Sequence, residues 1–185
     1  MKIYDEIAKE FSATRITPWP LVKSFVNSLK QHTTLLDVGC GNGKNQFRDD
    51  LYYVSVDSSI EMCKFVKGAI NCCATRLPFH SNSIDNCISI ACIHHLDSFE
   101  KRKLAVSEIY RVLKPGGSAM ISFWGAQKKY GIYDTYIKWK TDDKLRYYYL
   151  STIDCIKHLF KDFEYSVVED YNNFYVQLKK NVNIL

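Results

Sequence analysis

The sequence predicts a single α/β domain whose mostly parallel sheet is covered by helices on both faces. Segments with strand character alternate with amphipathic helical segments along most of the chain, which is typical of a doubly wound sheet. The apolar run 35–38 contains an acid and leads into Gly39, Gly41 and Gly43, which suits a buried strand whose backbone turns sharply beneath a ligand. A length of 185 residues fits one such domain and leaves no room for a second.

Composition narrows the class of protein further. The chain is 46% apolar and 24% charged, which suits a soluble domain with a sizeable core. It contains no charged-then-apolar leader and no run of about eighteen apolar residues, so we expect neither export nor a membrane partner. The net charge of +5 permits a polyanionic partner without requiring one.

The seven cysteines indicate a reducing environment. They include no Cys-x-x-Cys pair, and most fall in apolar segments, where a free cysteine behaves as a small hydrophobic residue. We therefore expect reduced thiols and a cytoplasmic protein, with the nucleus as a second location. The adjacent pairs Cys72-Cys73 and His94-His95 lack the ligand spacing of closed zinc sites, so no metal site is predicted.

Residues 1–31 are predicted to form a helical cap. An apolar stripe with helical spacing over residues 4–11 indicates a short amphipathic helix, which we place near the mouth of the ligand site. Pro18 and Pro20 end this helix. Pro20 also suits the first position of a second helix, whose apolar stripe runs to about residue 30.

Strands and helices are expected to alternate between this cap and the C-terminal third. The strands are expected over residues 33–38, 52–57, 69–74, 83–92 and 118–124. A helix of at most two turns is expected after the glycines, a second helix over 59–69 and a longer amphipathic helix over 100–113. The stretch Lys114-Pro115-Gly116-Gly117 is predicted to end the longer helix.

The C-terminal third begins with a basic, aromatic insert over residues 125–146. Its weak periodicity predicts an ordered loop or lid within the single domain. A helix is expected over residues 151–160. Strands over residues 163–169 and 174–178, joined across Asn172-Asn173, are predicted to form a terminal hairpin.

A cofactor site is predicted at the carboxyl ends of the strands, where the ligands of doubly wound sheets bind. Asp57 ends the second strand twenty residues after Asp37, and its two carboxylate oxygens suit both hydroxyls of a ribose. Asp57 or Ser58 could also cap the helix that follows, and this role is compatible with cofactor binding. The segments expected to converge at this edge are residues 39–43, 73–75 and 91–95.

Several motifs together resemble the class I S-adenosylmethionine-dependent methyltransferases. They are residues 37–43, Asp57, Leu77-Pro78-Phe79, Ile84-Asp85, residues 93–96 and residues 108–117. The resemblance implies a seven-stranded sheet in which the terminal hairpin supplies the antiparallel strand, and S-adenosylmethionine as the cofactor. The residues that it implies for cofactor binding are Asp37, Gly39, Gly41, Asp57, Ser58, Cys73, Ala74, Thr75 and Ala91. Many family members have an acid at the position of Cys73, which accepts a hydrogen bond from adenine; a thiol accepts more weakly, so we expect weaker cofactor binding.

Features at both ends of the chain narrow the resemblance to the eukaryotic tRNA wobble-uridine carboxymethyl methyltransferases. They are residues 4–8, Phe11-Ser12, Thr14-Arg15, Pro18-Trp19-Pro20, His94-His95, Trp124 and Arg146-Tyr147-Tyr148. This resemblance implies methylation of 5-carboxymethyluridine in the tRNA anticodon loop to 5-methoxycarbonylmethyluridine, together with a small zinc-binding activator protein. The edge of the short third strand, Ile70 to Cys73, is where the activator is expected to add a strand.

Five residues are predicted to handle the acceptor, namely Arg15, His95, Trp124, Arg146 and Tyr147. A guanidinium recognises a carboxylate with a planar fork, so the two arginines are expected to position the acceptor carboxylate. His95 is expected to hold the uridine or its carboxymethyl group, and Trp124 and Tyr147 to stack on a splayed anticodon base. The alternatives are a surface salt bridge for either arginine and plain core packing for Trp124.

Two other functions fit parts of the sequence. The core motifs are shared with small-molecule methyltransferases of the same fold, and the thiol of Cys73 fits a non-catalytic scaffold. The flanks 14–20 and 146–148 favour the tRNA function over small molecules, while the intact glycines and Asp57 oppose a scaffold. No general base is predicted, because a carboxylate with a pKa of about 4 is already ionised at neutral pH.

Overall fold

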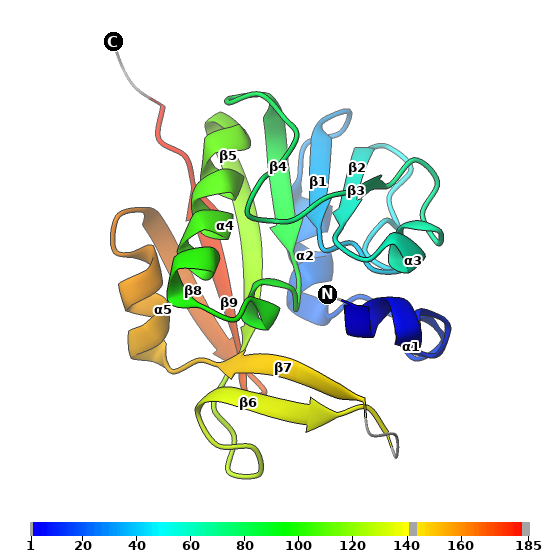
Figure 1. Ribbon diagram of the computed structural model, residues 1–185. Helices are drawn as coiled ribbons and strands as arrows, with labels where there is room; N and C mark the ends of the chain where they lie inside the picture. The colour runs from blue at the N-terminus through cyan, green and yellow to red at the C-terminus, as the bar shows by residue number, and fades with distance from the viewer. Residues whose placement is uncertain (1, 141–143, 183–185) are drawn as a thin grey trace.

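The computed structural model describes residues 2–140 and 144–182. Its centre is a seven-stranded sheet with the strand order β3-β2-β1-β4-β5-β9-β8. Helices cover both faces of this sheet, and a separate two-stranded hairpin, β6–β7, lies across the carboxyl end of its parallel strands (Figure 1). The predicted α/β fold class is therefore confirmed.

Most of the predicted strands form, and the terminal hairpin joins the sheet. The strands of the sheet are β1 (Thr34–Val38), β2 (Tyr52–Asp57), β3 (Ile70–Asn71), β4 (Ile84–Ser89), β5 (Leu113–Trp124), β8 (Glu164–Asp170) and β9 (Asn173–Lys179). Strands β1 to β5 pair in parallel, whereas β9 pairs antiparallel with both β5 and β8. The terminal hairpin thus supplies the antiparallel strand, as the resemblance implied.

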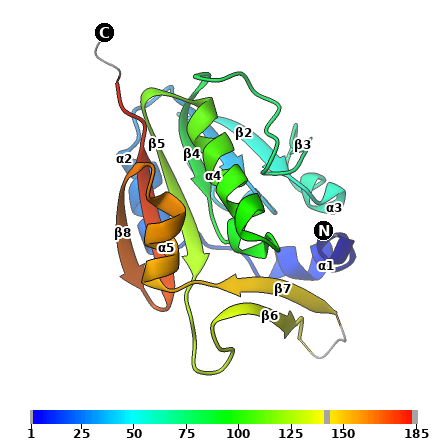
Figure 2. The ribbon, with the colours of Figure 1, turned by 60° about the vertical axis from the view of Figure 1, so that its left-hand side comes forward.

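Helices bury the two faces of the sheet. α4 (Phe99–Val112) and α5 (Ile153–Phe160) cover one face, and α2 (Pro20–Ser28) covers the other (Figure 2). The hydroxyls of Ser98 and Thr152 cap α4 and α5 by accepting a backbone N–H of the first turn. Apolar side chains of α4 and α5 meet those of β4, β5 and β9 in one core cluster. None of the helices in the described ranges is long and apolar enough to span a membrane.

α1 (Lys2–Ala13) lies apart from both helical layers, across the carboxyl ends of the parallel strands (Figure 1). Its buried residues Tyr4 and Ile7 pack against Met62, which follows β2, and Trp139, which follows β6. The amphipathic helix expected at the mouth of the ligand site is therefore present, and it touches the hairpin as well as the sheet.

The insert over residues 125–146 is not the loop or lid that we expected. β6 (Tyr133–Lys138) and β7 (Leu145–Leu150) form an antiparallel hairpin, and residues 141–143 lie outside the described residues. Alternate residues of β7 are buried, but one of them is Arg146. A cation at an inward position interrupts the apolar alternation that marks a strand in a sequence, and this is why the prediction was wrong.

Two predicted helices are absent or shorter than expected. The described stretch between the glycine loop and β2 contains turns and no helix. There Arg48 donates hydrogen bonds to the carbonyl oxygens of Val26 and Leu29 at the end of α2, and these contacts hold the segment in place of helical bonds. The helix expected over residues 59–69 is only the single turn α3 (Ile60–Cys63).

Strand β4 is also shorter than expected, because the chain turns away from the sheet before Cys92. The short 3-10 helix η1 (Ile93–His95) follows it. All three residues of η1 are buried, and the turn lies against β7 of the hairpin. The paired histidines are therefore part of the contact between sheet and hairpin.

Candidate functional site

A cleft opens at the carboxyl ends of β1, β2 and β4, between the glycine loop and α1. The predicted cofactor residues that line it are Gly39, Gly41, Asp57, Ser58, Cys73, Ala74 and Ala91. Asp37 precedes the lining residues on β1, and Thr75 places its hydroxyl oxygen 3.1 Å from the sulfur of Cys73. The structure thus gathers the predicted cofactor residues at one place, as the topology of a parallel sheet requires.

The glycine loop turns sharply because two glycines have backbone conformations that side chains disfavour. Gly39 has a φ of +76°, and a Cβ there would lie 2.4 Å from the sulfur of Cys92. Gly41 has a φ of +54°, and a Cβ there would meet no atom within 4 Å. The N–H groups of Gly39 and Cys40 donate to the carbonyl oxygen of Val56 at 2.8 and 3.0 Å. Gly39 therefore permits a close approach between loops, whereas Gly41 leaves the cleft open.

Two backbone hydrogen bonds fix the carboxylate of Asp57. The N–H of Gly41 donates to Oδ2 at 2.9 Å, and the N–H of Ser59 donates to Oδ1 at 2.8 Å. Burial raises the pKa of Asp57, and these two bonds oppose the rise. Each oxygen keeps a lone pair, so the carboxylate can still accept both hydroxyls of a ribose. The helix cap that we assigned to Asp57 or Ser58 belongs instead to Ser59, whose hydroxyl accepts the N–H of Met62.

Asp37 is a fully buried acid without a hydrogen-bond partner. Neither of its carboxyl oxygens is bonded to any described group. Burial, and secondarily the charge of Asp57, raise the pKa of Asp37 to about 7, while the charge of Lys44 opposes the rise. Because buried polar groups are nearly always paired, an unpaired carboxylate behind the cleft fits a ligand that brings a cationic group such as an ammonium.

α1 closes one side of the cleft through contacts that the sequence did not reveal. The side-chain amide of Asn42 donates to the carbonyl oxygens of Ser12 and Arg15 at 3.1 and 2.8 Å. Asp5 accepts a hydrogen bond of 2.6 Å from the hydroxyl of Ser59. The N-terminal segment is therefore bonded both to the glycine loop and to the loop that follows β2.

His95 links α1 to the hairpin. Its Nδ1 lies 2.8 Å from the carbonyl oxygen of Tyr147, and its Nε2 lies 2.8 Å from the hydroxyl of Tyr4. A carbonyl only accepts, so we assign the proton to Nδ1, and Nε2 accepts from Tyr4. Burial lowers the pKa of His95 to about 4, so the imidazole is neutral at physiological pH. A contact between His95 and uridine, as predicted, would require one of these two bonds to open.

Trp124 packs beneath the hairpin and is not among the residues that line the cleft. Its ring centre lies 4.9 Å from that of Tyr148 and 6.2 Å from that of Tyr130. Its backbone N–H donates to Nδ1 of His94 at 3.1 Å, so neutral His94 carries its proton on Nε2. Trp124 therefore packs in the core, which is the alternative to base stacking that the sequence left open.

Arg146 is a buried cation. The residue is 7% exposed, and its guanidinium carbon lies 4.8 Å from the ring centre of Trp139 and 5.1 Å from that of Tyr148. Its Nε has no hydrogen-bond partner, and no carboxylate within residues 2–140 and 144–182 forms an ion pair with it. The surface salt bridge that we considered for Arg146 is therefore not formed in this structure.

The remaining two predicted acceptor residues have different surroundings. Arg15 lines the cleft, with its guanidinium carbon 4.8 Å from the ring centre of Phe11 and Nη1 3.2 Å from the hydroxyl of Thr14. Tyr147 does not line the cleft, and its hydroxyl donates to the carboxylate of Asp134 on β6. The structure thus brings Arg15 close to the cofactor residues and leaves Tyr147 on the hairpin.

Three polar residues that line the cleft, Tyr4, Lys44 and Asn45, were given no role in the site from the sequence. Tyr4 was counted as part of an apolar helical face. Asn42 lies in the segment 39–43 that was expected at the site, but no contact was predicted for its side chain. A polar side chain inside a ligand-binding turn was the available signal, because functional groups concentrate on loops that a rigid sheet positions.

Known proteins share this fold. A family model described as a methyltransferase domain matches residues 36–121, which include the glycine loop, Asp57 and η1. This part of the chain is therefore similar to methyltransferase domains. The chain superposes on an S-adenosylmethionine-dependent methyltransferase of Methanosarcina mazei with a TM-score of 0.72 and 17% identity, over 91% of this chain and 100% of the other. It matches a chain of the complex between the Haloferax volcanii Trm112 methyltransferase activator and a methyltransferase with a TM-score of 0.70 and 15% identity, over 97% and 98% of the two chains.

Curated relatives of this chain carry the name tRNA (carboxymethyluridine(34)-5-O)-methyltransferase. The protein of Macaca fascicularis is 42% identical over 134 residues, which are 70% of this chain and 20% of that protein. The Arabidopsis thaliana protein is 38% identical over 69% of this chain and 33% of that protein. The Schizosaccharomyces pombe protein is 34% identical over 75% of this chain and 66% of that protein. The chain thus spans about a fifth of the length of the first of these relatives.

Proposed function

We propose that this methyltransferase transfers a methyl group from S-adenosylmethionine to the carboxylate of 5-carboxymethyluridine at the wobble position of tRNA, forming 5-methoxycarbonylmethyluridine. The names of relatives that are 42% and 34% identical support this acceptor. The observation that carries the proposal is Arg146, a buried guanidinium without a carboxylate of its own among the described residues.

The residues of the cleft fit S-adenosylmethionine. Asp57 is oriented for the ribose hydroxyls, and Gly41 leaves the space above the loop open. Cys73 and Ala74, which follow β3, also line the cleft, and the buried carboxylate of Asp37 would suit the ammonium group of the cofactor. When bound, the cofactor supplies an electrophilic methyl group, and no proton moves when a carboxylate oxygen bonds to it.

The argument for an anionic acceptor rests on the cost of burying Arg146. An ion that is removed from water without a partner destabilises the fold by several kcal/mol. Its contacts with the rings of Trp139 and Tyr148 offset only part of this, because cation–π contacts stabilise by about 0.5–2 kcal/mol. Tyr4 lines the cleft, and burial raises its pKa. The charge of Arg146 opposes this rise, so the guanidinium lies near the cleft wall. A bound carboxylate would supply the missing counter-charge.

The site needs no general base for this acceptor. A carboxylate with a pKa of about 4 is ionised at neutral pH, so its oxygen is already nucleophilic. Burial lowers the pKa of both His94 and His95, so neither imidazole carries a charge that would compete with Arg146. The protein then has to hold the carboxylate oxygen in line with the methyl group, and a guanidinium in a fixed position can do this.

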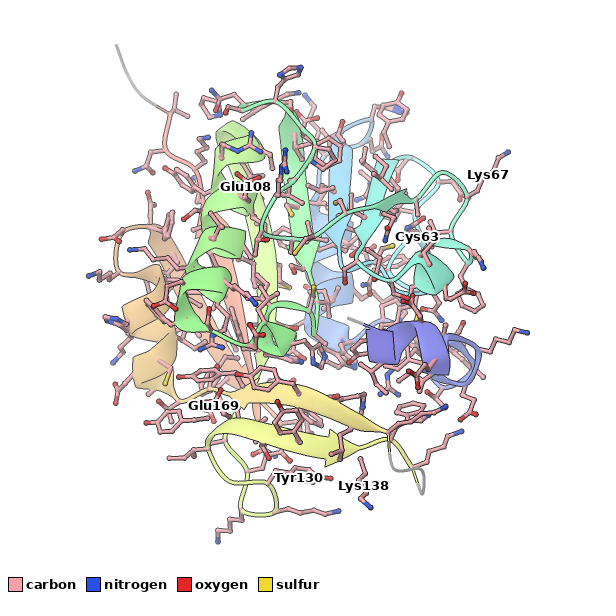
Figure 3. All side chains as sticks on the ribbon, in the orientation of Figure 1. Cys63, Lys67, Glu108, Tyr130, Lys138 and Glu169 are labelled. Carbon is pink, nitrogen blue, oxygen red and sulfur yellow. The ribbon has the colours of Figure 1, made fainter. Side chains whose placement is uncertain are left out.

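The outer side of the hairpin is proposed to contact the RNA. Tyr136 is 66% exposed and Tyr133 is 43% exposed, and Lys129 and Lys138 are exposed on the same segment. Figure 3 shows Lys138 projecting from the hairpin away from the sheet. Exposed aromatic rings and lysines together suit single-stranded RNA, because bases stack on the rings and cations neutralise phosphates.

The small zinc-binding activator is proposed to pair with β3. This strand consists of Ile70 and Asn71, both exposed, and it forms the edge of the sheet, with β2 as its neighbour. An exposed edge offers unpaired backbone groups to a strand of another chain. A structural neighbour occurs in a complex with the Trm112 methyltransferase activator, which supports a partner of this kind.

Mass spectrometry of tRNA nucleosides tests the proposed reaction. Partner-bound protein is incubated with labelled S-adenosylmethionine and with tRNA that carries 5-carboxymethyluridine. We expect the label in 5-methoxycarbonylmethyluridine, and we expect mild alkali to remove it because the product is an ester. Label that enters only another nucleoside, or only small molecules, would overturn the proposed acceptor.

Variants of Arg146 test the residue that carries the proposal. Arg146→Met fills a similar volume without burying a charge, so the fold should survive while ester formation is lost. Arg146→Lys keeps the charge without the planar fork and should retain part of the activity. Calorimetric titration with S-adenosylmethionine is the control, since the affinity should be the same in both variants as in the wild type. Full activity of Arg146→Met would remove the residue from the acceptor site.

A further inference from the structure

The hydroxyl of Tyr4 lies where the cofactor cleft meets Arg146. Tyr4 lines the cleft, and its oxygen lies 2.8 Å from Nε2 of His95. Burial and the neighbouring Tyr148 raise the pKa of Tyr4, while the charge of Arg146 and its hydrogen bond to the phenol oxygen oppose the rise. One buried phenol oxygen thus has an imidazole nitrogen, a second hydroxyl and a guanidinium as neighbours.

The direction of the hydrogen bonds around this oxygen follows from one backbone carbonyl. The carbonyl oxygen of Tyr147 only accepts, so Nδ1 of the neutral His95 carries the proton and Nε2 accepts. The phenol of Tyr4 has a single proton, which it donates to Nε2. The phenol oxygen is then an acceptor toward Tyr148 and Arg146, and a guanidinium only donates. Donors and acceptors therefore alternate without conflict from Tyr147 to Arg146.

This bond gives Arg146 a direction that its other contacts do not. The rings of Trp139 and Tyr148 lie 4.8 and 5.1 Å from the guanidinium carbon, and rings attract a cation through their faces without selecting one N–H group. A hydrogen bond is directional, because it weakens steeply when the donor angle departs from a straight line. If the phenol proton of Tyr4 pointed at Arg146 instead, two donors would face each other in a buried site, where an unpaired donor is costly.

We propose that His95 and Tyr4 are positioning residues for Arg146. His95 takes the proton of the phenol, and the phenol oxygen then holds the guanidinium in the orientation that receives the acceptor carboxylate. The inference rests on the proposed function and extends it, because His95 acts through Tyr4 and Arg146 and needs no contact with uridine. Both hydrogen bonds of His95 then stay closed when the acceptor binds.

The binding of two matched anticodon stem-loops tests this arrangement. One loop carries 5-carboxymethyluridine at the wobble position, and the other carries 5-carbamoylmethyluridine, an uncharged amide of nearly the same shape. Partner-bound protein is saturated with S-adenosylhomocysteine, so that no methyl group is transferred. The ratio of the two affinities measures the recognition of the carboxylate alone. The wild type should prefer the carboxylate loop about ten- to a hundredfold, as expected for a hydrogen bond between charged groups.

Two variants interrupt the chain of hydrogen bonds at different atoms. Tyr4→Phe removes the oxygen that holds Arg146, and His95→Met removes the acceptor of the phenol proton. Each should lower the preference for the carboxylate loop about three- to tenfold, the contribution of one hydrogen bond. The affinity for the carbamoyl loop should change less than about twofold, whereas a general loss of structure would weaken the binding of both loops. The double variant should lose no more than either single variant, because both act through the same bond.

Two further variants serve as controls. His95→Gln supplies an amide oxygen that accepts the phenol proton in place of Nε2, so it should retain most of the preference. Tyr149→Phe removes a hydroxyl from the same strand as Arg146, but this hydroxyl donates to the sulfur of Cys155 at 3.4 Å and takes no part in the chain. The preference should therefore be that of the wild type.

Three outcomes would overturn the inference. The first is a wild-type preference in both Tyr4→Phe and His95→Met, which would leave the proposed acceptor intact and assign the orientation of Arg146 to other groups. The second is an equal loss for both loops, or additive losses in the double variant, which would show that the residues act separately on the structure. The third is a wild type that binds both loops equally, which would overturn recognition of the carboxylate by Arg146 together with this inference.

Discussion

Replacing Gly39 with alanine tests whether contact with Cys92 shapes the cofactor loop. The added Cβ would lie 2.4 Å from the sulfur and 2.7 Å from the Cβ of Cys92, in a backbone with a φ of +76°. Carbon atoms do not approach each other so closely, so the loop or the residue after β4 must move. Gly41→Ala is the matched control, because Gly41 also has a positive φ but its added Cβ would meet nothing within 4 Å.

The expected loss of stability has two parts. A non-glycine residue in the left-handed region costs about 1–2 kcal/mol, and both substitutions share this cost. Overpacking a closed site costs about 1–3 kcal/mol more, which applies only to Gly39→Ala. The free energy of unfolding should therefore fall by about 2–5 kcal/mol in Gly39→Ala and by about 1–2 kcal/mol in Gly41→Ala.

Equilibrium unfolding in urea, followed by circular dichroism, measures both changes. A double-mutant cycle isolates the clash, because Cys92→Gly removes both close atoms of Cys92. In the Cys92→Gly background, Gly39→Ala should lower the free energy of unfolding only as much as Gly41→Ala does in the wild type. The reasoning is refuted if Gly39→Ala is no more destabilising than Gly41→Ala. It is also refuted if Gly39→Ala lowers the free energy of unfolding equally with and without Cys92→Gly.

Three further predictions concern Asp37, Tyr4 and Ile70. Burial raises the pKa of Asp37 from 3.8 to about 7, so the folded state keeps a proton that the unfolded state releases. The free energy of unfolding without cofactor should therefore fall by roughly 3 kcal/mol from pH 4 to pH 7 and change little above pH 8. Asp37→Asn should remove this slope in urea titrations, and an unchanged slope would assign it to other groups. Tyr4→Phe leaves Nε2 of His95 unpaired and should lower the free energy of unfolding by about 1–3 kcal/mol in the same assay, whereas no change would mean that the bond is not formed. Ile70→Lys puts a charge on the exposed edge of β3 and should abolish co-purification with the activator without weakening cofactor binding; an intact complex would place the partner elsewhere.

The cofactor half of the site could be predicted because local rules determine it. A strand that ends in glycines, an acid at the end of the next strand and a parallel topology together place Gly41 and Asp57 at one edge of the sheet. The N–H of Gly41 donates directly to Asp57, so the two motifs found separately in the sequence meet in one hydrogen bond. The helix cap expected at Asp57 or Ser58 is instead Ser59, one or two positions later.

The contacts of the proposed acceptor residues could not be predicted, because they join distant parts of the chain. His95 bonds to Tyr4, which is 91 residues away, and to Tyr147, which is 52 residues away. Nothing in the local pattern around His94-His95 shows that both nitrogens of His95 have protein partners. The hairpin was missed for the same reason, since Arg146 becomes an inward residue only through the rings of Trp139 and Tyr148 on either side.

α1 connects these two halves and explains why the flanks of the chain carry information about the acceptor. Through Asp5 and the Asn42 contacts it is bonded to the loops that surround the cofactor, and through Tyr4 it is bonded to His95 beneath the hairpin. Glu10 adds a second bond to the hairpin by accepting a hydrogen bond of 3.2 Å from the indole N–H of Trp139, the ring that covers Arg146. A displacement of α1 would therefore open the cofactor cleft and uncover the buried guanidinium together. Cofactor binding and acceptor binding then depend on one helix, so substitutions in α1 should weaken both, whereas Arg146→Met should weaken only acceptor binding.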